Sequence, residues 1–392
     1  MSDTTTADET ESQAALIQDL VAKFVRRELM PLENEFLARR ARGVQPFLPE
    51  AQTARLRQVS KELGLWGLDA PAELGGTDLP SSVMVRAWEE LARTPVPFQL
   101  PPDSPNLRMM AAIGSPEQKA KYLQPYIDGE ITSAIAISEP GAGGDPTAIK
   151  TRAERQGDEW VLNGRKIWIS HGKDADFLIV MARVGDGAGR EGITSFVVEK
   201  GTPGFIIERE IPMVGTIFTY EIVFEDCRIP AGALLGTIGQ GYEPMQLRLR
   251  TRRLEMGANA IGMAQRALDM LVEHANQRVT FGVPLADRQA IQWWVSDIST
   301  RLHACRLMVR DAAEKVDAGK SASHEISMIK VFATELAYEA LDQAMQTLGA
   351  LGMTQETVLY PMWQLARLMR IYEGPTEVHR QSIARRVLGR RA

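Results

Sequence analysis

The feature that most constrains the fold is a change of periodicity at about residues 131 and 235. Between these positions the chain carries short β-branched runs with Gly and Asp at turn positions, which indicates a β domain of roughly seven short strands. Gln156-Gly157-Asp158 and Asn163-Gly164 are predicted turn positions within it, the second with the signal of a hairpin turn. On both sides the apolar residues recur every three or four positions, as in helices. The sequence therefore predicts a mostly α protein with a central β domain.

These textures also predict the domain boundaries. We expect a disordered lead-in over residues 1–12, which are acidic and polar, and an N-terminal helical domain over 13–130. The β domain is expected over 131–237 and a C-terminal helical domain over 238–392. Residues 256–272 are apolar almost all the way round, so they are predicted to form a helix inside a bundle.

Composition excludes several classes of function. A formal net charge of -5 argues against binding to a nucleic-acid backbone, and no run approaches the roughly 18 apolar residues of a membrane span. The two cysteines, Cys227 and Cys305, and the five histidines lack the spacing of a zinc site or a disulfide framework. The sequence predicts a cytoplasmic protein with no nucleic-acid partner, no integral membrane segment and no metal.

Glu373 is the candidate catalytic carboxylate. It follows an apolar, helix-like run and precedes Gly374-Pro375, which a helix cannot continue through. Its side chain is therefore expected at a forced break in the backbone. A helix-end charge in solvent is the alternative interpretation.

Four further segments have the chemistry of a binding site. Residues 138–145 (SEPGAGGD) offer glycines that let a backbone approach an anion or a flat ring, although a glycine-rich turn explains them equally well. Trp168 and Ser170 offer an aromatic plane and a hydroxyl, or a core tryptophan. Residues 278–282 (RVTFG) offer a cation for a phosphate, or a solvated helix end. Residues 346–352 (QTLGALG) by themselves indicate only a helix C-cap.

The order and spacing of these pieces resemble the acyl-CoA dehydrogenases over nearly the whole chain. The matching segments are VRRELMPLE, KELGLWGL, SEPGAGGD, GDEWVLNGRKIWISHG, FEDCRIP, GMAQRALD, RVTFG, QTLGALG and IYEG. The resemblance implies an N-terminal helical domain, a middle β-barrel or sandwich and a C-terminal four-helix bundle. It also implies a homotetramer, arranged as a dimer of dimers, with FAD bound between domains and across a subunit interface.

The resemblance assigns the cofactor contacts in two groups. The group at the flavin ring comprises Ile137, Ser138, Trp168 and Ser170, with Ser170 where Thr is usual, and Gly143 and Gly144 are assigned to the cofactor without a position along it. The group at the pyrophosphate and adenine half comprises Arg278, Phe281 and Gln289, together with Gln346, Gly349 and Ala350 of another subunit. Thr376 and Glu377 fall at the adenosine end.

The resemblance makes Glu373 the base that removes the α-proton of an acyl-CoA while flavin N5 accepts the β-hydride, giving the trans-2-enoyl-CoA. Donors on the thioester carbonyl, among them the base's own N–H, would stabilise the enolate, and expulsion of water would raise the pKa of Glu373. Gly374 would let the backbone approach the substrate, and Arg253 would contact coenzyme A. Electrons would pass to an electron-transfer flavoprotein, as in fatty acid β-oxidation.

Two alternatives stay open. Some relatives carry the base on the long buried helix, where this chain has Arg252, with Glu255 nearby and Asn259 as its expected hydrogen-bond partner. An oxygen-using flavin oxidase or monooxygenase on the same fold, or a non-catalytic flavin-binding protein, is the alternative function.

The chain departs from the family pattern at four further positions and in one segment. Pro375 stands where Thr is usual, Glu377 where Gln is usual, Gly144 where Ser is usual, and Ala350 where a second Gly is usual. The segment MVGTIFTYEIVFEDC lacks the usual Arg-x-Ser. The ending GPTEVH is more similar to the branch that includes the dehydrogenase domains of acyl-CoA dehydrogenase family members ten and eleven. The acyl group of the substrate therefore does not follow from the resemblance.

Overall fold

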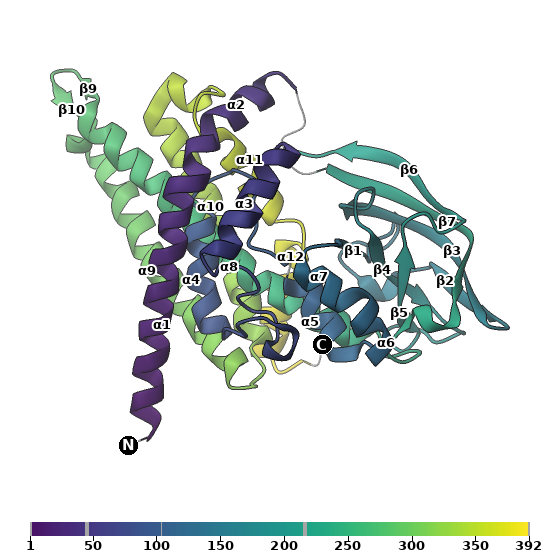
Figure 1. Cartoon of the computed structure of the whole chain (residues 1–392). Coiled ribbons are helices and arrows are strands. Elements are labelled where there is room, and N and C mark those ends of the chain that lie inside the picture. The colour runs from purple at the N-terminus through teal and green to yellow at the C-terminus, as the bar shows by residue number, and fades with distance from the viewer. Residues whose placement is uncertain (1, 44–46, 103, 215–217, 391–392) are drawn as a thin grey trace.

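The structure is a computed structural model that describes residues 2–43, 47–102, 104–214 and 218–390. Part of the segment MVGTIFTYEIVFEDC, which lacks the usual Arg-x-Ser, lies outside the residues that the structure describes, at residues 215–217. Helices form the first and last parts of the chain and strands the middle part, so the predicted class, mostly α with a central β domain, is confirmed. Figure 1 shows the strands of the middle part gathered at one end of the molecule and most helices of the two flanking parts packed together at the other.

The N-terminal region contains seven α-helices among the described residues. They are α1 (Ser2–Phe24), α2 (Glu33–Ala41), α3 (Glu50–Glu62), α4 (Ser81–Leu91), α5 (Ser104–Ile113), α6 (Pro116–Gln118) and α7 (Gln124–Asp128). Apolar side chains of α1 and α4 join those of the C-terminal helices in one core. The prolines at positions 95, 97, 101 and 102 separate α4 from α5, as their lack of a backbone N–H predicts, and Pro105 lies in the first turn of α5, where a missing N–H is tolerated.

The structure places residues 2–12 in α1 rather than in the predicted disordered lead-in. Glu11 of α1 lies 2.5 Å from Arg86 of α4 and 3.7 Å from Arg310 of α9 (Gln289–Asp317). A prediction of disorder from polar composition alone does not take account of such ion pairs between distant parts of the chain.

The β domain is one sheet with the strand order β6-β7-β3-β2-β4-β5-β8, and β1 pairs in parallel with β4. Its strands are β1 (Ser133–Ala136), β2 (Arg152–Gln156), β3 (Glu159–Ser170), β4 (Phe177–Arg183), β5 (Ile193–Glu199), β6 (Phe205–Pro212), β7 (Phe218–Pro230) and β8 (Leu234–Leu235). Two runs that the sequence predicts as separate strands, 158–164 and 166–170, are the single strand β3.

The predicted hairpin turn at Asn163-Gly164 is wrong. Both residues lie inside β3, at a shift in the register with β7. The other predicted turn, Gln156-Gly157-Asp158, is confirmed and joins β2 to β3, since Gln156 pairs with Glu159. Gly164 is needed because it adopts φ +153 and a Cβ there would lie 2.6 Å from the Thr151 Cα. The Asn163 side chain accepts the Asp226 N–H at 2.8 Å, so it serves the bulge rather than a turn.

The C-terminal region is a bundle built on the long helix α8. Its elements are α8 (Tyr242–Gln277), the hairpin strands β9 (Val279–Thr280) and β10 (Val283–Pro284), α9 (Gln289–Asp317), α10 (Ser323–Leu348), α11 (Leu359–Met369) and α12 (Thr376–Val387). A Cβ on Gly257 would lie 2.3 Å from Ile329 of α10, and one on Gly262 would lie 2.0 Å from the Glu89 carbonyl oxygen of α4. The predicted burial of residues 256–272 inside the bundle is confirmed by these contacts on different faces.

A separate apolar cluster joins the domains. It brings Leu107 and Met109 of α5 together with Ile179 of β4 and Leu249 of α8. The start of α8 therefore lies where the N-terminal helices, the β domain and the bundle meet. No helix in the described ranges is both long and apolar enough to cross a membrane.

Candidate active site

Glu373 lies in the short connection between α11 and α12. Its backbone has φ +56, a left-handed conformation that a residue with a Cβ rarely adopts, and such strain occurs preferentially at functional sites. Gly374 has φ +97, and a Cβ there would lie 3.0 Å from His379 Nε2. Pro375 then precedes the first residue of α12. The break that Gly374-Pro375 predicts is present.

Three side chains hold this connection through its carbonyl groups. Arg253 Nε donates to the Glu373 carbonyl oxygen at 2.7 Å, and His379 Nε2 lies 3.3 Å from the same oxygen. The fully buried Lys330 donates through Nζ to the Gly374 carbonyl oxygen at 3.0 Å. The structure thus places Arg253, which the resemblance assigns to coenzyme A, behind the carboxylate, where it fixes the strained backbone.

The Glu373 side chain forms an ion pair that the sequence reasoning missed. Arg248 Nη1 lies 2.6 Å from Glu373 Oε1, and Arg248 Nε donates to Asn106 Oδ1 at 3.2 Å. Among the described residues, the buried Oε2 of Glu373 has no hydrogen-bond partner. The available signal was the arginine-rich run RLRTRR at the start of a helix predicted to be buried. One carboxylate oxygen is therefore paired and the other is free to take a proton.

Burial and charge act in opposite directions on this carboxyl group. Burial raises the pKa of Glu373, but the Arg248 ion pair and the charges of Arg252 and Arg253 outweigh it, so the pKa lies below its ordinary value. In the protein without substrate the pKa of Glu373 is therefore lowered, whereas expulsion of water by an acyl chain is expected to raise it. Something in the complex must weaken the Arg248 interaction for Glu373 to accept a proton readily.

The rival carboxylate, Glu255, is used structurally. Its Oε1 lies 2.5 Å from Arg252 Nη1 and 3.5 Å from Asn259 Nδ2, the partner expected from the sequence. Arg252 itself occupies the alternative base position on α8. This pairing favours Glu373 over Glu255 as the base.

The residues assigned to the flavin ring come from the end of β1 and from β3. Trp168 has φ +63 and is 49% exposed, so the alternative interpretation of this residue as a core tryptophan does not hold. Ser170 is also exposed, while Ile137 and Ser138 are half-buried. The Ser138 carbonyl oxygen accepts the Ile167 N–H at 3.0 Å, which joins the two segments. An exposed indole beside these backbone groups suits a planar ring.

A buried ion pair anchors the glycine-rich segment. Lys166 Nζ, on β3, lies 2.8 Å from Glu139 Oε1 and donates to the Ile137 carbonyl oxygen at 3.0 Å. Glu139 also accepts the N–H groups of Lys150 and Thr151. A Cβ on Gly143 would meet nothing within 4 Å, so this position is open to a ligand. The segment is a fixed platform rather than a simple turn.

The second group of predicted cofactor residues lies elsewhere in the chain. Arg278 ends α8, Phe281 is the 99% exposed tip of the β9–β10 hairpin, and Gln289 begins α9. The residues at the end of α10 are likewise exposed: Gln346, Gly349 and Ala350. In Figure 1 the hairpin projects from the end of the molecule opposite the β domain. One chain does not bring Arg278 and Trp168 together.

Of the two residues at the predicted adenosine end, Thr376 is buried and Glu377 is exposed. The Thr376 hydroxyl lies 3.2 Å from the Arg370 carbonyl oxygen, to which it donates. Thr376 therefore closes the connection before α12, and only Glu377 is accessible to a ligand.

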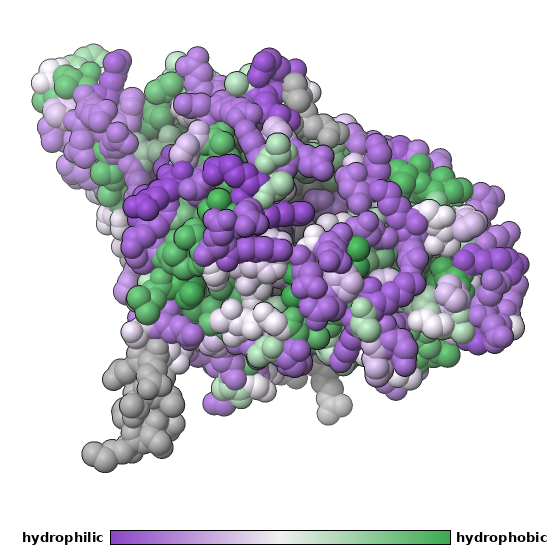
Figure 2. Space-filling view, in the orientation of Figure 1, coloured by the Kyte–Doolittle hydropathy of each residue, from purple (hydrophilic) through white to green (hydrophobic). Residues whose placement is uncertain are grey.

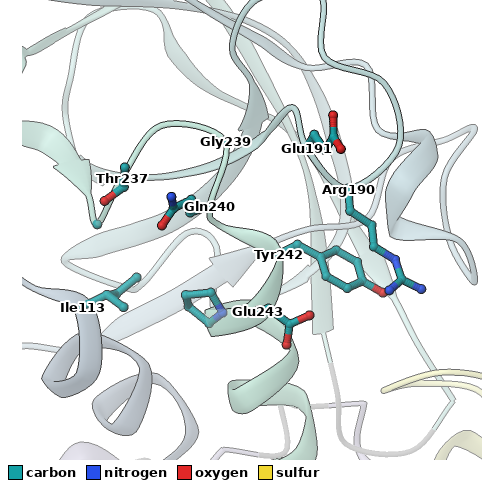
Figure 3. Close-up of a pocket in the computed structure, with 10 residues that line it drawn as sticks. Ile113, Arg190, Glu191, Thr237, Gly239, Gln240, Tyr242 and Glu243 are labelled. Carbon is teal, nitrogen blue, oxygen red and sulfur yellow. The ribbon is translucent and has the colours of Figure 1, made fainter.

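A pocket of about 620 Å³ opens beside the start of α8 (Figure 3). The Arg190 guanidinium lies over the Tyr242 ring, 4.8 Å from its centroid, and Glu191 and Glu243 also line the pocket. Tyr242 precedes Arg248 by six residues, which is about 9 Å along a helix axis. The pocket and the Glu373 site therefore share one helix.

The three regions each match a family model. Residues 10–130 match the acyl-CoA dehydrogenase N-terminal domain, 134–227 the middle domain and 239–388 the C-terminal domain. The chain belongs to the acyl-CoA dehydrogenase family. It is therefore an oxidoreductase of a family that dehydrogenates acyl-CoA thioesters with a flavin.

Its relatives span different reactions. (R)-Benzylsuccinyl-CoA dehydrogenase of Thauera aromatica is 38% identical over 387 residues, which cover 96% of this chain and 95% of that protein. The 3-(aryl)acrylate reductase of Clostridium sporogenes is 33% identical, with 96% and 98% covered. The structure of butyryl-CoA dehydrogenase from Megasphaera elsdenii superposes with a TM-score of 0.87 at 30% identity and covers 96% of this chain and 98% of that one.

Gly144 and Pro375, two positions at which this acyl-CoA dehydrogenase departs from the family pattern, pack against each other. A Cβ on Gly144 would lie 3.3 Å from Val378 Cγ2 and 3.7 Å from Pro375 Cγ. A serine at position 144 would therefore crowd the start of α12, whereas glycine leaves room for the proline ring. The glycine-rich segment and the Glu373 connection pack directly against each other.

We expect the free energy of unfolding to fall as the pH drops from about 6.5 towards about 4, partly through His379. Burial lowers the pKa of His379 to about 4, with smaller effects of Arg253 and Lys330. Within that window the unfolded chain binds a proton that the folded chain excludes, so acid favours unfolding. His379→Asn is expected to reduce the loss between pH 7 and pH 5 by about 1 to 2 kcal/mol. Urea denaturation at both pH values measures it, and an unaltered loss in the variant would contradict the assignment.

Proposed function

We propose that this protein is an FAD-dependent acyl-CoA dehydrogenase that converts an acyl-CoA thioester to the trans-2-enoyl-CoA, with Glu373 as the base. The observation that carries the proposal is the Glu373 carboxylate, held in a left-handed backbone with a buried oxygen that lacks a partner among the described residues. A helix-end charge in solvent has neither property.

The residues have distinct roles in the proposed reaction. Glu373 Oε2 accepts the α-proton, while Arg253 and Lys330 hold the backbone that carries it. Within the described part of the chain, the Glu373 N–H donates to no backbone acceptor, so it is available to the thioester carbonyl. A bound flavin would supply the acceptor for the β-hydrogen, which leaves as a hydride. The exposed Trp168 and Ser170 would hold its ring.

The cofactor site requires a second subunit. Since Arg278 and the α10 end lie apart from the Trp168 platform, we place the adenine half of FAD against a neighbouring copy in a homotetramer, a dimer of dimers. The exposed apolar side chains of the hairpin, Val279, Phe281 and Val283, support this assembly. In Figure 2 an apolar group lies at the upper left, where Figure 1 places the β9–β10 hairpin.

Arg278→Ala is expected to weaken FAD retention and tetramer formation together. A charged hydrogen bond to a phosphate is worth about 1.5 to 3 kcal/mol, or about 10-fold to 100-fold in affinity. The ratio of bound flavin to protein and the mass in solution measure both effects. Arg228→Ala, at an exposed position on β7, is the control. Unchanged flavin content and mass in the Arg278 variant would mean that Arg278 is an ordinary surface residue.

Anaerobic bleaching of the flavin by a panel of acyl-CoA thioesters tests the proposed function. The panel varies chain length, branching and charge, and the same acyl groups on pantetheine lack the nucleotide. We assign the pocket at the start of α8 to the nucleotide of coenzyme A. The pantetheine thioesters, which lack it, are therefore expected to show higher KM values. A flavin-loaded protein that no thioester bleaches would contradict the function.

The electron acceptor is the second part of the test. We propose an electron-transfer flavoprotein, and its reduction by enoyl-CoA-forming turnover is the expected result. Stoichiometric peroxide formed in air without an added acceptor would instead identify an oxidase. Enoyl-CoA reduction that outpaces acyl-CoA oxidation would indicate a reductase.

A further inference from the structure

A buried arginine beside the base presents a chemical problem for the proposed reaction. The side chains of Arg248 and Glu373 are only 10% and 13% exposed, and they lie 2.6 Å apart. An ion pair stabilises the deprotonated carboxylate, so it opposes the proton transfer that a base must perform. If Arg248 interacted only with Glu373 during the reaction, it would slow the proton transfer to that carboxylate. Arg248 therefore needs a partner during turnover other than Glu373.

The guanidinium group has room for that partner. Of its five N–H groups, one on Nη1 is directed to Glu373 and the one on Nε to Asn106 Oδ1. Within the described ranges, Nη2 makes no hydrogen bond and no ion pair. Three N–H groups therefore remain, one on Nη1 and two on Nη2, and N–H groups on these two nitrogens form the planar fork that matches a carboxylate.

The orientation of Arg248 is set from the opposite wall of the site. Asn106 lies on α5, which follows the proline-rich segment, and its own Nδ2 donates to Ser133 Oγ at 3.0 Å. Both Asn106 and Arg248 are buried. Arg248 is therefore held between two domains by a neutral amide, an arrangement that fixes its direction and keeps its charge available.

We propose that Arg248 binds a second carboxylate on the acyl group, and that the substrate is the mono-CoA thioester of a short or branched dicarboxylic acid. This inference rests on the proposed function. Reacting atoms approach to ~3 to 3.5 Å, and an ionic N···O contact is ~2.8 Å. The carboxylate therefore lies within a few bonds of the α-carbon. By pairing with Arg248 it competes with Glu373 for the guanidinium charge, so the correct substrate weakens the ion pair that keeps its base deprotonated.

Binding is tested separately from turnover. The probes are 3-thiaglutaryl-CoA, which has sulfur in place of the β-carbon and cannot lose a β-hydrogen, and its methyl ester. Titration of the flavin's visible spectrum measures Kd. The wild-type protein is expected to bind the free acid at least about 30-fold more tightly than the ester. Anaerobic bleaching by succinyl-CoA and glutaryl-CoA, each against its methyl ester, measures turnover.

Variants assign the preference to Arg248. In Arg248→Gln the ratio of the two Kd values is expected to fall below about 3, and Arg248→Lys, a point charge without the fork, should keep an intermediate ratio. Arg250→Gln removes a neighbouring positive charge and is expected to keep the wild-type ratio. Flavin content verifies that each variant is folded, and the lysine variant serves if the glutamine variant is not.

Each outcome has one meaning. Equal binding of acid and ester by the wild-type protein, or a preference that survives in Arg248→Gln, overturns the inference. A binding preference that Arg248→Gln abolishes, without bleaching by any thioester, supports the carboxylate site and overturns the proposed function.

Discussion

Glu373→Gln is expected to lower the rate of anaerobic flavin bleaching by about three or more orders of magnitude with every acyl-CoA tested. Glutamine keeps the size of the side chain but cannot accept the α-proton, and loss of a positioned base has an effect of this scale or larger. Flavin content is expected to stay normal, because the backbone carbonyl that Arg253 binds is retained. Single-turnover absorbance at the flavin band measures the rate.

Glu255→Gln is the matched control for that experiment. Glu255 is also a buried carboxylate, but it lies on α8 and its Oε1 is shared by Arg252 and Asn259. We expect its effect to be mainly on stability. If Glu373→Gln bleached at a nearly normal rate while Glu255→Gln lost the reaction, the base would be on α8.

Lys166→Met is expected to lower the free energy of unfolding by about 3 to 5 kcal/mol and to weaken FAD retention. The substitution leaves the Glu139 carboxylate buried without its cation, and removal of one partner of a buried ion pair has an effect of this size. It also frees the Ile137 carbonyl oxygen and so loosens the flavin platform. Urea denaturation and the ratio of flavin to protein measure the two effects.

Two controls isolate the buried charge. Lys150→Met removes an exposed lysine next to the same carboxylate but keeps the N–H that Glu139 accepts at 2.6 Å, so it is expected to be nearly neutral. The double variant Lys166→Met/Glu139→Gln should be more stable than Lys166→Met alone, since no buried charge is left unpaired. A single variant as stable as the wild-type protein would show that this pair does not anchor the platform.

The sequence predicted the features that depend on local pattern. The break at Gly374-Pro375, the helix buried on most of its sides and the change to a β domain follow from backbone sterics and from the spacing of apolar residues. The turn at residues 157–158 and the bulge at Gly164 were not separated, because glycine suits both and only contact with Thr151 distinguishes them.

Contacts between distant residues required the tertiary structure. Gly144 and Pro375 are separate departures from the family pattern in the sequence, but in the structure they lie together. Arg253 has the residue type of a phosphate ligand, yet its Nε binds the carbonyl of the base. Charge and size alone do not decide between these uses.

For Glu373 itself, the sequence determined its residue type, its forced backbone break and its place in the acyl-CoA dehydrogenase pattern. Only the tertiary structure decided its partner, because Arg248 lies 125 positions earlier and meets it where α5, α8 and the α11–α12 connection converge. An ion pair depends on the distance between two charges in space, and no local pattern in either segment encodes that distance.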